Sequence, residues 1–408
     1  MADIVIIGGG HAAAQLVTSL KQQKFDGSIV LISDENELPY QRPPLSKAYL
    51  KGEMTRERLV INRQKLYEDM NVDLKLNCRA EKIDREAKSV LLADGSTIPY
   101  GSLILATGGH ARQLEVPGCD KTGLHYVRKI ADIDAMHASW DKAEKIVIIG
   151  GGYIGLEIAA VARGAEKSVT LLEAEDRLLK RVTAPTVSEF YHAVHSSKGV
   201  DIQLNKIATA FEGDDCIRSV VTQDGARLEA DLVIIGIGLI ANSELADAAG
   251  LETNQAGIVV NAQCQTSDSD IYAVGDVTWH HNPFYDRHMR LESVQNAVDQ
   301  AKVAIQHICG HDVSYNAQPW FWSDQYELKL QMVGLNQGYD EIIERGSREE
   351  GKLAFFYLKE GRMIAADCIS SMAEFMQSKK LIAARVPVTA DSLQDPRPFK
   401  EVATDLLG

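Results

Sequence analysis

Residues 144–157 have the sequence EKIVIIGGGYIGLE, and this stretch decides the fold. A β-branched run passes into three glycines and then into residues that favour a helix. Gly150-x-Gly152-x-x-Gly155 is a complete fingerprint of the strand–turn–helix unit that binds a dinucleotide pyrophosphate. The first glycine allows the tight turn, the second lets backbone approach the phosphates, and the helix N-terminus supplies N–H groups. The stretch therefore predicts a nucleotide-binding domain of parallel strands and helices.

A similar stretch, DIVIIGGGHAAAQ, opens the chain at residues 3–15. Gly8 and Gly10 take the first two positions of the fingerprint, and Ala13 takes the third. The next strand ends in Ser33-Asp34-Glu35, where either Asp34 or Glu35 can bind ribose hydroxyls. The two copies are about 140 residues apart, roughly one domain length. We therefore expect two dinucleotide sites, and a hydride enzyme that holds NADH and a second dinucleotide is expected to hold FAD.

Glu173 ends the strand that follows the second fingerprint, about 20 residues on, as a ribose-binding acid should. A carboxylate there accepts hydrogen bonds from both ribose hydroxyls and repels a 2′-phosphate, which predicts NAD(H) over NADP(H). Arg181, with Arg177 and Lys180, lies just downstream. If these bases belong to the nucleotide site, they would weaken the preference for NAD(H). If they form a solvated face, they would not affect it, and the sequence leaves both interpretations open.

The pattern of apolar runs predicts the architecture. Runs that are apolar on successive residues suit parallel strands buried on both faces, and they alternate with helical stretches. This predicts an α/β protein with two doubly wound, Rossmann-like domains. From Ala317 the texture changes to alternating apolar and polar residues with turn glycines, which predicts an antiparallel sheet, a helix at about 372–384 and a Pro-rich tail. The expected domains are residues 1–108 with 240–316 for FAD, 109–239 for NADH, and an α+β domain at 317–408.

Composition excludes several classes of function. The net charge of −14 argues against nucleic acid as a partner. The six cysteines show neither CxxC pairing nor metal-ligand spacing, which is typical of reduced thiols in a cytoplasmic protein. No apolar run approaches the roughly 20 residues that span a bilayer, and the N-terminus does not resemble a signal peptide. The histidines in WHHNPFYDRH (279–288) match no tight metal site, and we expect that segment to be a loop.

Further motifs give the chain a family resemblance. TSDSDIYAVGDV (266–277) and LILATG (103–108), with the two fingerprints, resemble the two-dinucleotide-binding-domain flavoproteins of the glutathione-reductase-like superfamily. Within it, PYQRPPLSKAYL (39–50) and PWFWSDQYE (319–327) are similar to the oxygenase-coupled NADH–ferredoxin reductases. The resemblance covers essentially the whole chain. Residues 181–202 and 239–251 most resemble members that supply a cytochrome P-450-type monooxygenase.

The resemblance implies a set of site residues. On the FAD side they are Gly8, Gly10, Ala13, Asp34 or Glu35, Arg42, Lys47, Ala80, Arg128, Asp276 and Val294. On the NADH side they are Gly150, Gly152, Ile154, Gly155, Glu173, Arg181, Gly236 and Gly238. The departure at Ala13 only reduces the space at the third fingerprint position.

The chemistry follows from what the segment after the second strand contains. Disulfide reductases of the superfamily carry a redox CxxxxC there, but residues 36–52 contain no cysteine, so electrons must leave the flavin directly. The family places the lysine of PPLSK, here Lys47, near flavin N5. Glu157 is then expected to pair with it, because an unpaired ammonium beside an apolar ring is costly. The alternative for Glu157 is an ordinary surface helix residue.

Two tryptophans lie two residues apart on one expected strand, so they face the same way. Trp322 matches the family's tryptophan beside the flavin; it would shield the ring and shape the electron exit, and whether it carries electrons stays open. For Trp320 we expect core packing.

The predicted function is an FAD-dependent NADH:ferredoxin reductase. It would pass electrons one at a time to a [2Fe–2S] ferredoxin that feeds a P-450-type monooxygenase. The alternatives are a rubredoxin reductase, the reductase of a ring-hydroxylating dioxygenase, and an NADH-binding interaction protein like the apoptosis-inducing-factor relatives. The last class should show basic stretches or long insertions, and the sequence has neither. A local basic patch of Arg287, Arg290, Lys329, Lys379, Lys380 and Arg385 is expected to receive an acidic ferredoxin, unless these are scattered solvated residues.

Overall fold

The computed structural model describes residues 2–408 and divides into two compact units. The first contains Met1–Arg42, Met54–His110 and Leu239–Ala317. The second contains Pro43–Glu53, Ala111–Gly238 and Gln318–Gly408. The breaks near residues 110, 238 and 317 lie close to the expected domain limits, while Pro43–Glu53 belongs with the second unit. The division of the second unit into an NADH domain and a C-terminal domain stays a prediction.

The first unit is built on a parallel sheet in the order β3-β2-β1-β6, with β19 pairing parallel to β6. An antiparallel extension, β6-β5-β4, continues from it. The strands are β1 (Ala2–Ile7), β2 (Ile29–Ile32), β3 (Val72–Lys75), β4 (Ala80–Asp84), β5 (Ser89–Leu92), β6 (Thr97–Leu105) and β19 (Ile271–Ala273). Ile4 and Ile6 of β1 pack in one apolar cluster with α1 (His11–Gln22) and α8 (Val294–Ile308), whereas Val5 and Ile7 pack in another. Burial on both faces confirms the α/β prediction.

A second, smaller sheet of this unit has the order β17-β18-β20-β21. Its strands are β17 (Thr253–Asn254), β18 (Gly257–Val260), β20 (Thr278–Asn282) and β21 (Arg287–Met289). The expectation of a loop at residues 279–288 is wrong, because β20 and β21 form an antiparallel hairpin in which His281 lies opposite His288. The short helices of the unit are α2 (Arg56–Leu59), α3 (Gln64–Asp69) and α7 (Glu244–Ala248), and the unit also contains β16 (Leu239–Ala241).

The second unit repeats the parallel sheet, in the order β11-β10-β9-β15-β8. Its strands are β8 (Leu124–Tyr126), β9 (Lys145–Ile149), β10 (Ser168–Glu173), β11 (Val200–Leu204) and β15 (Leu232–Ile235), and its helices are α4 (Ile130–Trp140), α5 (Tyr153–Gly164) and α6 (Pro185–Ser197). A three-stranded antiparallel sheet of β12 (Ala208–Glu212), β13 (Ser219–Thr222) and β14 (Arg227–Glu229) covers one face: Phe211 and Val220 share an apolar cluster with Val147 and Val233. The segment PPLS forms a 3-10 turn, η1 (Pro43–Ser46). The short strand β7 (Gly109–Ala111) lies where the chain passes from the first unit into the second.

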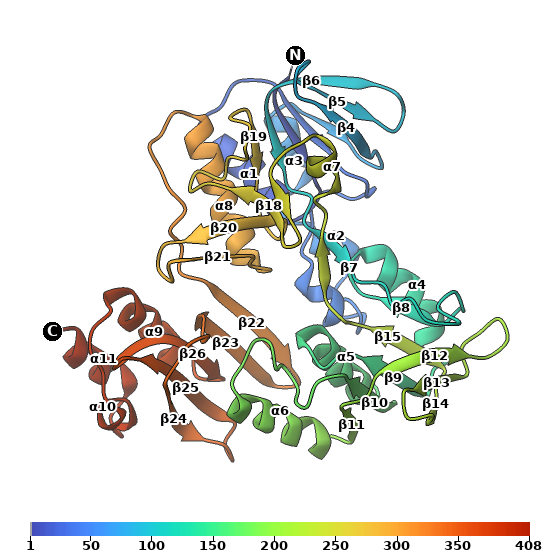
Figure 1. Ribbon diagram of the computed structural model, residues 1–408, viewed down its shortest axis with the longest axis vertical. Helices are drawn as coiled ribbons and strands as arrows, with labels where there is room; N and C mark the ends of the chain where they lie inside the picture. The colour runs from blue at the N-terminus through green and yellow to red at the C-terminus, as the bar shows by residue number, and fades with distance from the viewer. Residues whose placement is uncertain (1) are drawn as a thin grey trace. The chain divides into compact units, whose positions relative to one another are not determined.

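The C-terminal part is the expected antiparallel sheet, in the order β22-β23-β26-β25-β24. Its strands are β22 (Trp320–Gln325), β23 (Leu328–Gly334), β24 (Glu341–Ser347), β25 (Lys352–Lys359) and β26 (Arg362–Ile369). The expected helix is α9 (Met372–Ala384), which contacts β23 and β26 (Figure 1). The tail, for which we expected no helix, forms α10 (Ala390–Gln394) and α11 (Phe399–Leu407).

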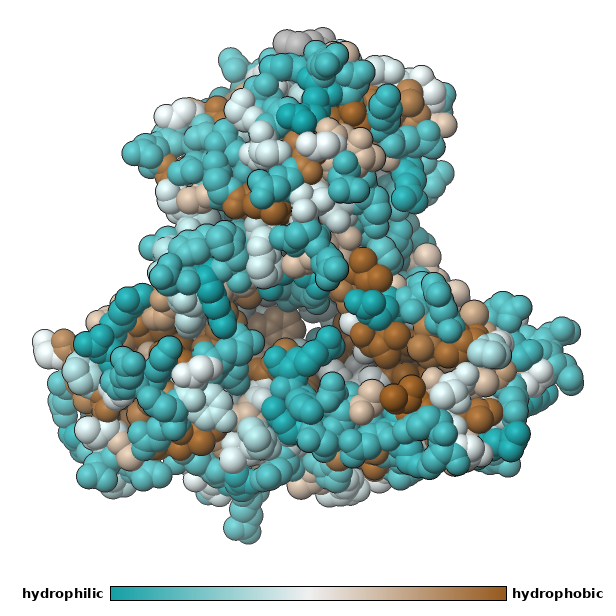
Figure 2. All heavy atoms as spheres, viewed as in Figure 1, coloured by the Kyte–Doolittle hydropathy of each residue, from teal (hydrophilic) through white to brown (hydrophobic). Residues whose placement is uncertain are grey.

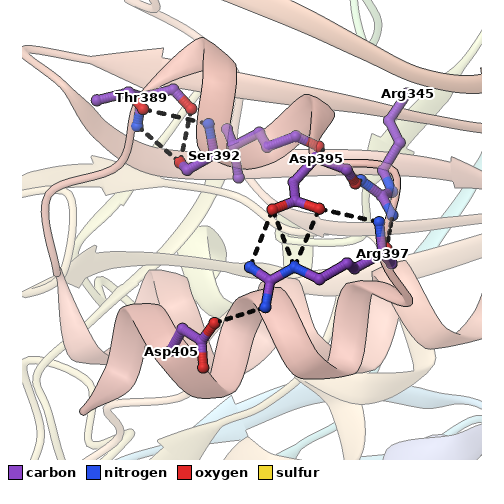
Figure 3. A network of polar contacts seen from close by, with 7 residues as sticks. Arg345, Thr389, Ser392, Asp395, Arg397 and Asp405 are labelled. Atoms are coloured by element: carbon purple, nitrogen blue, oxygen red, sulfur yellow. Dashed lines mark hydrogen bonds and ion pairs between the residues drawn. The ribbon is translucent and has the colours of Figure 1, made fainter.

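Arg345 on β24 anchors this tail, as Figure 3 shows together with the ion pairs of Arg397. Its guanidinium donates to the backbone carbonyls of Leu393, Asp395 and Arg397 at 3.0, 2.5 and 2.6 Å. A planar group with several donors can satisfy three carbonyls, at the end of α10 and in the segment that leads to α11.

Hydrophilic residues cover most of the face drawn in Figure 2. Across residues 2–408, no helix is long and apolar enough to cross a bilayer.

Candidate functional site

The turn between β1 and α1 forms an open cradle in the first unit. Gly8 has φ +135°, and a Cβ there would lie 2.1 Å from the carbonyl oxygen of Ala106. A Cβ on Gly10, the N-cap of α1, would meet nothing within 4 Å. The uncapped N–H groups of the helix start therefore face open space that suits a phosphate. Ala13 lies behind them, fully buried.

The turn between β9 and α5 repeats this geometry in the second unit. A Cβ on Gly150 (φ +112°) would lie 2.3 Å from the carbonyl oxygen of Gly236, and one on Gly155 would lie 2.0 Å from that of Gly150. Only glycine permits this packing of helix against strand. At Gly152, the N-cap of α5, a Cβ would again meet nothing within 4 Å. Both cradles thus have room where a dinucleotide pyrophosphate would sit.

Residues at the ends of β10 and β15 line the second cradle. Glu173 accepts hydrogen bonds from the backbone N–H of Gly151 at 2.6 Å and of Glu175 at 2.8 Å, so its carboxylate is held against the glycine turn. A Cβ on Gly238 would lie 3.8 Å from the guanidinium of Arg181. Ile154, in the first turn of α5, is 43% exposed. The structure therefore brings the predicted second-cradle residues together.

The other bases near Arg181 are used structurally. Arg177 donates to the hydroxyl of Ser188 at 2.6 Å and to the backbone carbonyl of Thr183 at 3.0 Å. Lys180 forms an ion pair with Glu175 at 2.8 Å. Arg181 is the base whose guanidinium lies beside Gly238, at the second cradle.

The acids of the first unit differ from Glu173. Ile32 pairs with Ile7 as Leu172 pairs with Ile149, so Ser33 occupies the register position of Glu173. Glu35, two residues later, forms an ion pair with Arg42 at 2.5 Å, and its other oxygen accepts from the hydroxyl of Tyr40 at 2.6 Å. Asp34 is exposed. Both oxygens of Glu35 are therefore already engaged.

The Gly275-Asp276 turn lies beside the first cradle. A Cβ on Gly275 would lie 3.6 Å from the Cβ of Ala12 and 3.5 Å from that of Ala297. The side chain of Gln300 on α8 accepts from the N–H of Gly275 at 2.7 Å, which holds the turn. The strand before the turn, β19, ends at Ala273.

Three further predicted residues begin elements or follow them. Val294 begins α8, whose N-cap Ser293 accepts from the N–H of Asn296 at 3.0 Å. Ala80 begins β4 in the first unit, and Arg128 follows β8 in the second. Their contacts with a cofactor stay predictions.

Glu157 is the centre of a buried polar cluster in the second unit. It is 4% exposed, and its carboxylate forms an ion pair with Lys47 at 2.7 Å, as expected. The hydroxyl of Ser46 donates to the same oxygen at 2.5 Å, and that of Ser323 donates to the other oxygen at 2.6 Å. The alternative of a surface glutamate is therefore wrong, because α5 turns this position inward.

Sequence reasoning missed Ser46 and Ser323. Ser46 lies within the PPLSK motif and Ser323 within FWSDQ, but neither motif tells which partner a hydroxyl will meet. A usable signal was the alternation along β22, which puts Ser323 on the face opposite Trp322.

The tryptophans of β22 lie on the other face of that strand. Trp320 and Trp322 stack with ring centroids 5.5 Å apart, which confirms that they face the same way. Both are half-buried, so Trp320 is not the core residue that we expected. It packs against Phe375 of α9, with Lys379 over its ring at 5.5 Å.

The structure also places the histidines and the basic residues that the sequence singled out. Within residues 2–408, no three His, Cys, Asp or Glu side chains gather as a metal site would require. Arg287 and Arg290 lie in the first unit, whereas Lys329, Lys379, Lys380 and Arg385 lie in the second. All six cysteines are free, and burial raises the pKa of the Cys78 thiol.

Comparison with known proteins gives the same picture. The model for pyridine nucleotide-disulphide oxidoreductases matches residues 2–301, and a reductase C-terminal model matches residues 320–402. The chain is 43% identical over 406 residues to a ferredoxin–NAD(P)(+) reductase of a Sphingomonas species, covering 98% of each chain. It is 43% identical over 407 residues to putidaredoxin reductase of Pseudomonas putida, covering 98% of this chain and 96% of that one.

A solved structure of a covalent putidaredoxin reductase–putidaredoxin complex is also similar. It matches with a TM-score of 0.95 and 42% identity, over 99% of each chain.

Proposed function

Because this chain belongs to the pyridine nucleotide-disulphide oxidoreductase family, we propose that it is an FAD-dependent NADH:ferredoxin reductase. The observation that carries the proposal is the Lys47–Glu157 ion pair at 2.7 Å. Lys47 lies in the segment after the second strand, where disulfide reductases of the family carry their redox cysteines, and its partner Glu157 lies on α5. A lysine paired with a carboxylate, in a segment without cysteine, suits an enzyme whose electrons leave the flavin directly.

The two cradles are assigned to different dinucleotides. The first cradle would hold the FAD pyrophosphate on the N-terminus of α1, beside the Gly275-Asp276 turn. The second would hold NADH, with the Glu173 carboxylate receiving its ribose hydroxyls. In the first cradle, Asp34 or Glu35 would receive the ribose hydroxyls of FAD.

When bound, FAD supplies the step that side chains cannot, since it accepts a hydride from NADH and returns the electrons singly. The residues of this chain would bind and orient the two dinucleotides and stabilise charge at the flavin. Lys47 would present its ammonium to the flavin N5 side, with Glu157 fixing its position and charge. Trp322 would cover the flavin and shape the electron exit. Proximity of the nicotinamide to flavin N5 would provide the rate of hydride transfer.

The acceptor is proposed to be an acidic [2Fe–2S] ferredoxin that supplies a cytochrome P-450-type monooxygenase in the cytoplasm. A ring-hydroxylating dioxygenase is the alternative oxygenase, and a rubredoxin the alternative carrier.

A panel of carriers tests the proposal. Purified protein should contain FAD, and NADH oxidation should reduce cytochrome c rapidly only when a [2Fe–2S] ferredoxin is added. Rubredoxin in place of ferredoxin should give a much lower rate. Equal rates with rubredoxin would favour a rubredoxin reductase, and no carrier-dependent rate at all would overturn the proposal.

A further inference from the structure

A hydrogen-bonded chain extends from Glu157 through the interior of the second unit. Ser323 Oγ lies 2.6 Å from Glu157 Oε1, and Gln325 Nε2 lies 3.2 Å from Ser323 Oγ. Gln325 Oε1 lies 2.9 Å from His195 Nε2, and the hydroxyl of Tyr326 lies 3.2 Å from His195 Nδ1. Ser323, Gln325 and His195 are all fully buried.

The donor and the acceptor of every hydrogen bond in this chain follow from Glu157, at one end of it. The Glu157 carboxylate, paired with an ammonium, can only accept, so Ser323 must donate its hydroxyl proton to it. Ser323 Oγ is then left to accept, which requires the amide NH₂ of Gln325. The carbonyl oxygen of Gln325 consequently faces His195 and accepts from Nε2–H.

The hydrogen-bonded chain therefore selects one tautomer of His195. Nε2 carries the proton, and Nδ1 accepts from the hydroxyl of Tyr326. Burial lowers the pKa of His195 to about 4, so the ring is neutral near pH 7. All the donors in the chain of bonds point toward Glu157.

The hydrogen-bonded chain ends, away from Glu157, at a turn whose backbone is strained. Tyr326 lies in the β22–β23 hairpin turn with φ +56°, a conformation that bulky residues rarely adopt. Its ring contacts His195 with centroids 5.0 Å apart, and its hydroxyl bonds the same ring. Contacts to α6 thus hold the turn, and the hydrogen bonds join α5, β22 and α6.

We infer that Ser323 and His195 are positioning residues that orient Glu157 and moderate its negative charge, and thereby place the Lys47 ammonium. The inference rests on the proposed function, in which Lys47 lies beside the flavin. Neither residue would touch flavin or nicotinamide; both act through Glu157. Because Trp322 is on the opposite face of β22, the same bonds fix the strand that carries it.

Ser323→Ala is the first test. It removes one donor from Glu157, which leaves the carboxylate more negative. A more negative neighbour disfavours the reduced, anionic flavin, so the flavin midpoint potential should fall and its reduction by NADH should slow by about tenfold, the effect of one hydrogen bond to a charged group. Ser323→Thr keeps the hydroxyl and should restore both values. The matched control is Ser378→Ala, which removes a fully buried hydroxyl that has no hydrogen-bond partner within residues 2–408.

His195 is tested by a pair of variants. His195→Gln keeps a donor for Gln325 and should stay near the wild-type rate, whereas His195→Leu should slow flavin reduction as Ser323→Ala does. His192→Gln, on the same helix and outside the hydrogen-bonded chain, is the control.

A double-variant cycle separates positioning from general stability. In a Glu157→Gln background, Ser323→Ala should have no further effect on the rate of flavin reduction, because the charge that it moderates is absent. Effects that add would show that Ser323 acts independently of Glu157. A readout independent of activity is the ¹⁵N NMR spectrum of labelled histidine at pH 7, in which His195 should be protonated at Nε2 and not at Nδ1.

Two outcomes overturn the inference: additive effects in the cycle, or Ser323→Ala and His195→Leu enzymes that behave like their controls while the wild type reduces ferredoxin normally. If the wild type reduces no ferredoxin, the proposed function fails instead. The NMR tautomer then still decides whether the donors of the hydrogen-bonded chain point toward Glu157.

Discussion

Glu157 is a buried carboxylate, and its neighbours explain how the fold tolerates it. An isolated charge in the interior costs several kcal/mol, but an ammonium and two hydroxyls at 2.5–2.7 Å offset that cost. Its pairing with Lys47 was predictable because family motifs carry both residues. The hydroxyls of Ser46 and Ser323 were not, since no spacing pattern specifies which segments tertiary packing brings together.

Asp367 is a second buried carboxyl, and it gives a pH-dependent prediction. It is 4% exposed, its bond from Tyr357 is 2.6 Å long, and burial raises its pKa to about 7 from 3.8. Between these values the unfolded chain loses this proton while the folded chain keeps it, so stability falls as pH rises from about 4 to 7. Asp367→Asn lacks the penalty and should exceed the wild type in stability at pH 8, by up to roughly 4 kcal/mol at 1.36 kcal/mol per pKa unit.

Thermal unfolding at pH 4.5 and pH 8 checks this prediction. The advantage of the Asn variant should be small at pH 4.5 and large at pH 8, while the exposed control Asp391→Asn should show no such trend. An advantage of equal size at both pH values would mean that Asp367 does not change protonation on unfolding.

We expect Glu173 to determine coenzyme preference. Glu173→Ala removes the acceptor for ribose hydroxyls and the charge that repels a 2′-phosphate. The ratio of kcat/KM for NADH to that for NADPH should fall by at least about tenfold. Steady-state kinetics with both coenzymes measure it, with Glu175→Ala as the control, and an unchanged ratio would remove Glu173 from the nucleotide site.

At the scale of elements, buried parallel strands were the most predictable. The run IVII (146–149) forms all but the first residue of β9 (Lys145–Ile149), because burial on both faces leaves an unbroken apolar signature. The hairpin of β20 and β21 was missed, since WHHNPFYDRH lacks that signature and its strands are short and polar. The tail helices were missed because α10 has five residues and depends on capping and on Arg345.

The two glycine turns predict separable effects. A Cβ on Gly10 or Gly152 would meet no atom within 4 Å. A side chain there should therefore leave the fold intact but fill the space in which we expect a phosphate. Gly10→Val protein should be folded and purify without FAD, whereas Gly152→Val protein should keep FAD and lose reduction by NADH. Absorbance spectra and anaerobic mixing with NADH distinguish the two.

Gly164→Ala, also in open space, is the control for both substitutions. Loss of FAD from Gly152→Val but not from Gly10→Val protein would reverse the assignment of the cradles.

The tail depends on Arg345. Arg345→Met leaves three backbone carbonyls without their donor and should cost about 2–3 kcal/mol locally. Limited proteolysis should then cleave within residues 390–408 well before the rest of the chain. Arg348→Met, which breaks an exposed ion pair with Glu344, should leave the cleavage rate unchanged. Equal protection of both variants would show that other contacts hold the tail.

At the scale of the whole molecule, the chain contains one architecture twice. Each copy has a parallel sheet, a glycine turn and three antiparallel strands, and the second copy is inserted in sequence between residues 110 and 239 of the first. The glycine fingerprints revealed the duplication. The repeated antiparallel strands were invisible in the sequence, because their residues differ and only their packing on the parallel strands is shared. Two glycine cradles, and a segment at residues 36–52 that contains no cysteine, are the basis of our proposal that the protein splits a hydride into single electrons.

The stoichiometry of electron delivery tests that claim most directly. A limiting amount of NADH is added anaerobically to catalytic protein and excess oxidised [2Fe–2S] ferredoxin, and the reduced clusters are counted by absorbance and by electron paramagnetic resonance. We predict two reduced ferredoxins per NADH, with no thiol or disulfide added. Ferredoxin that stays oxidised while NADH reduces the flavin, or reduction that requires an added dithiol, would contradict the claim.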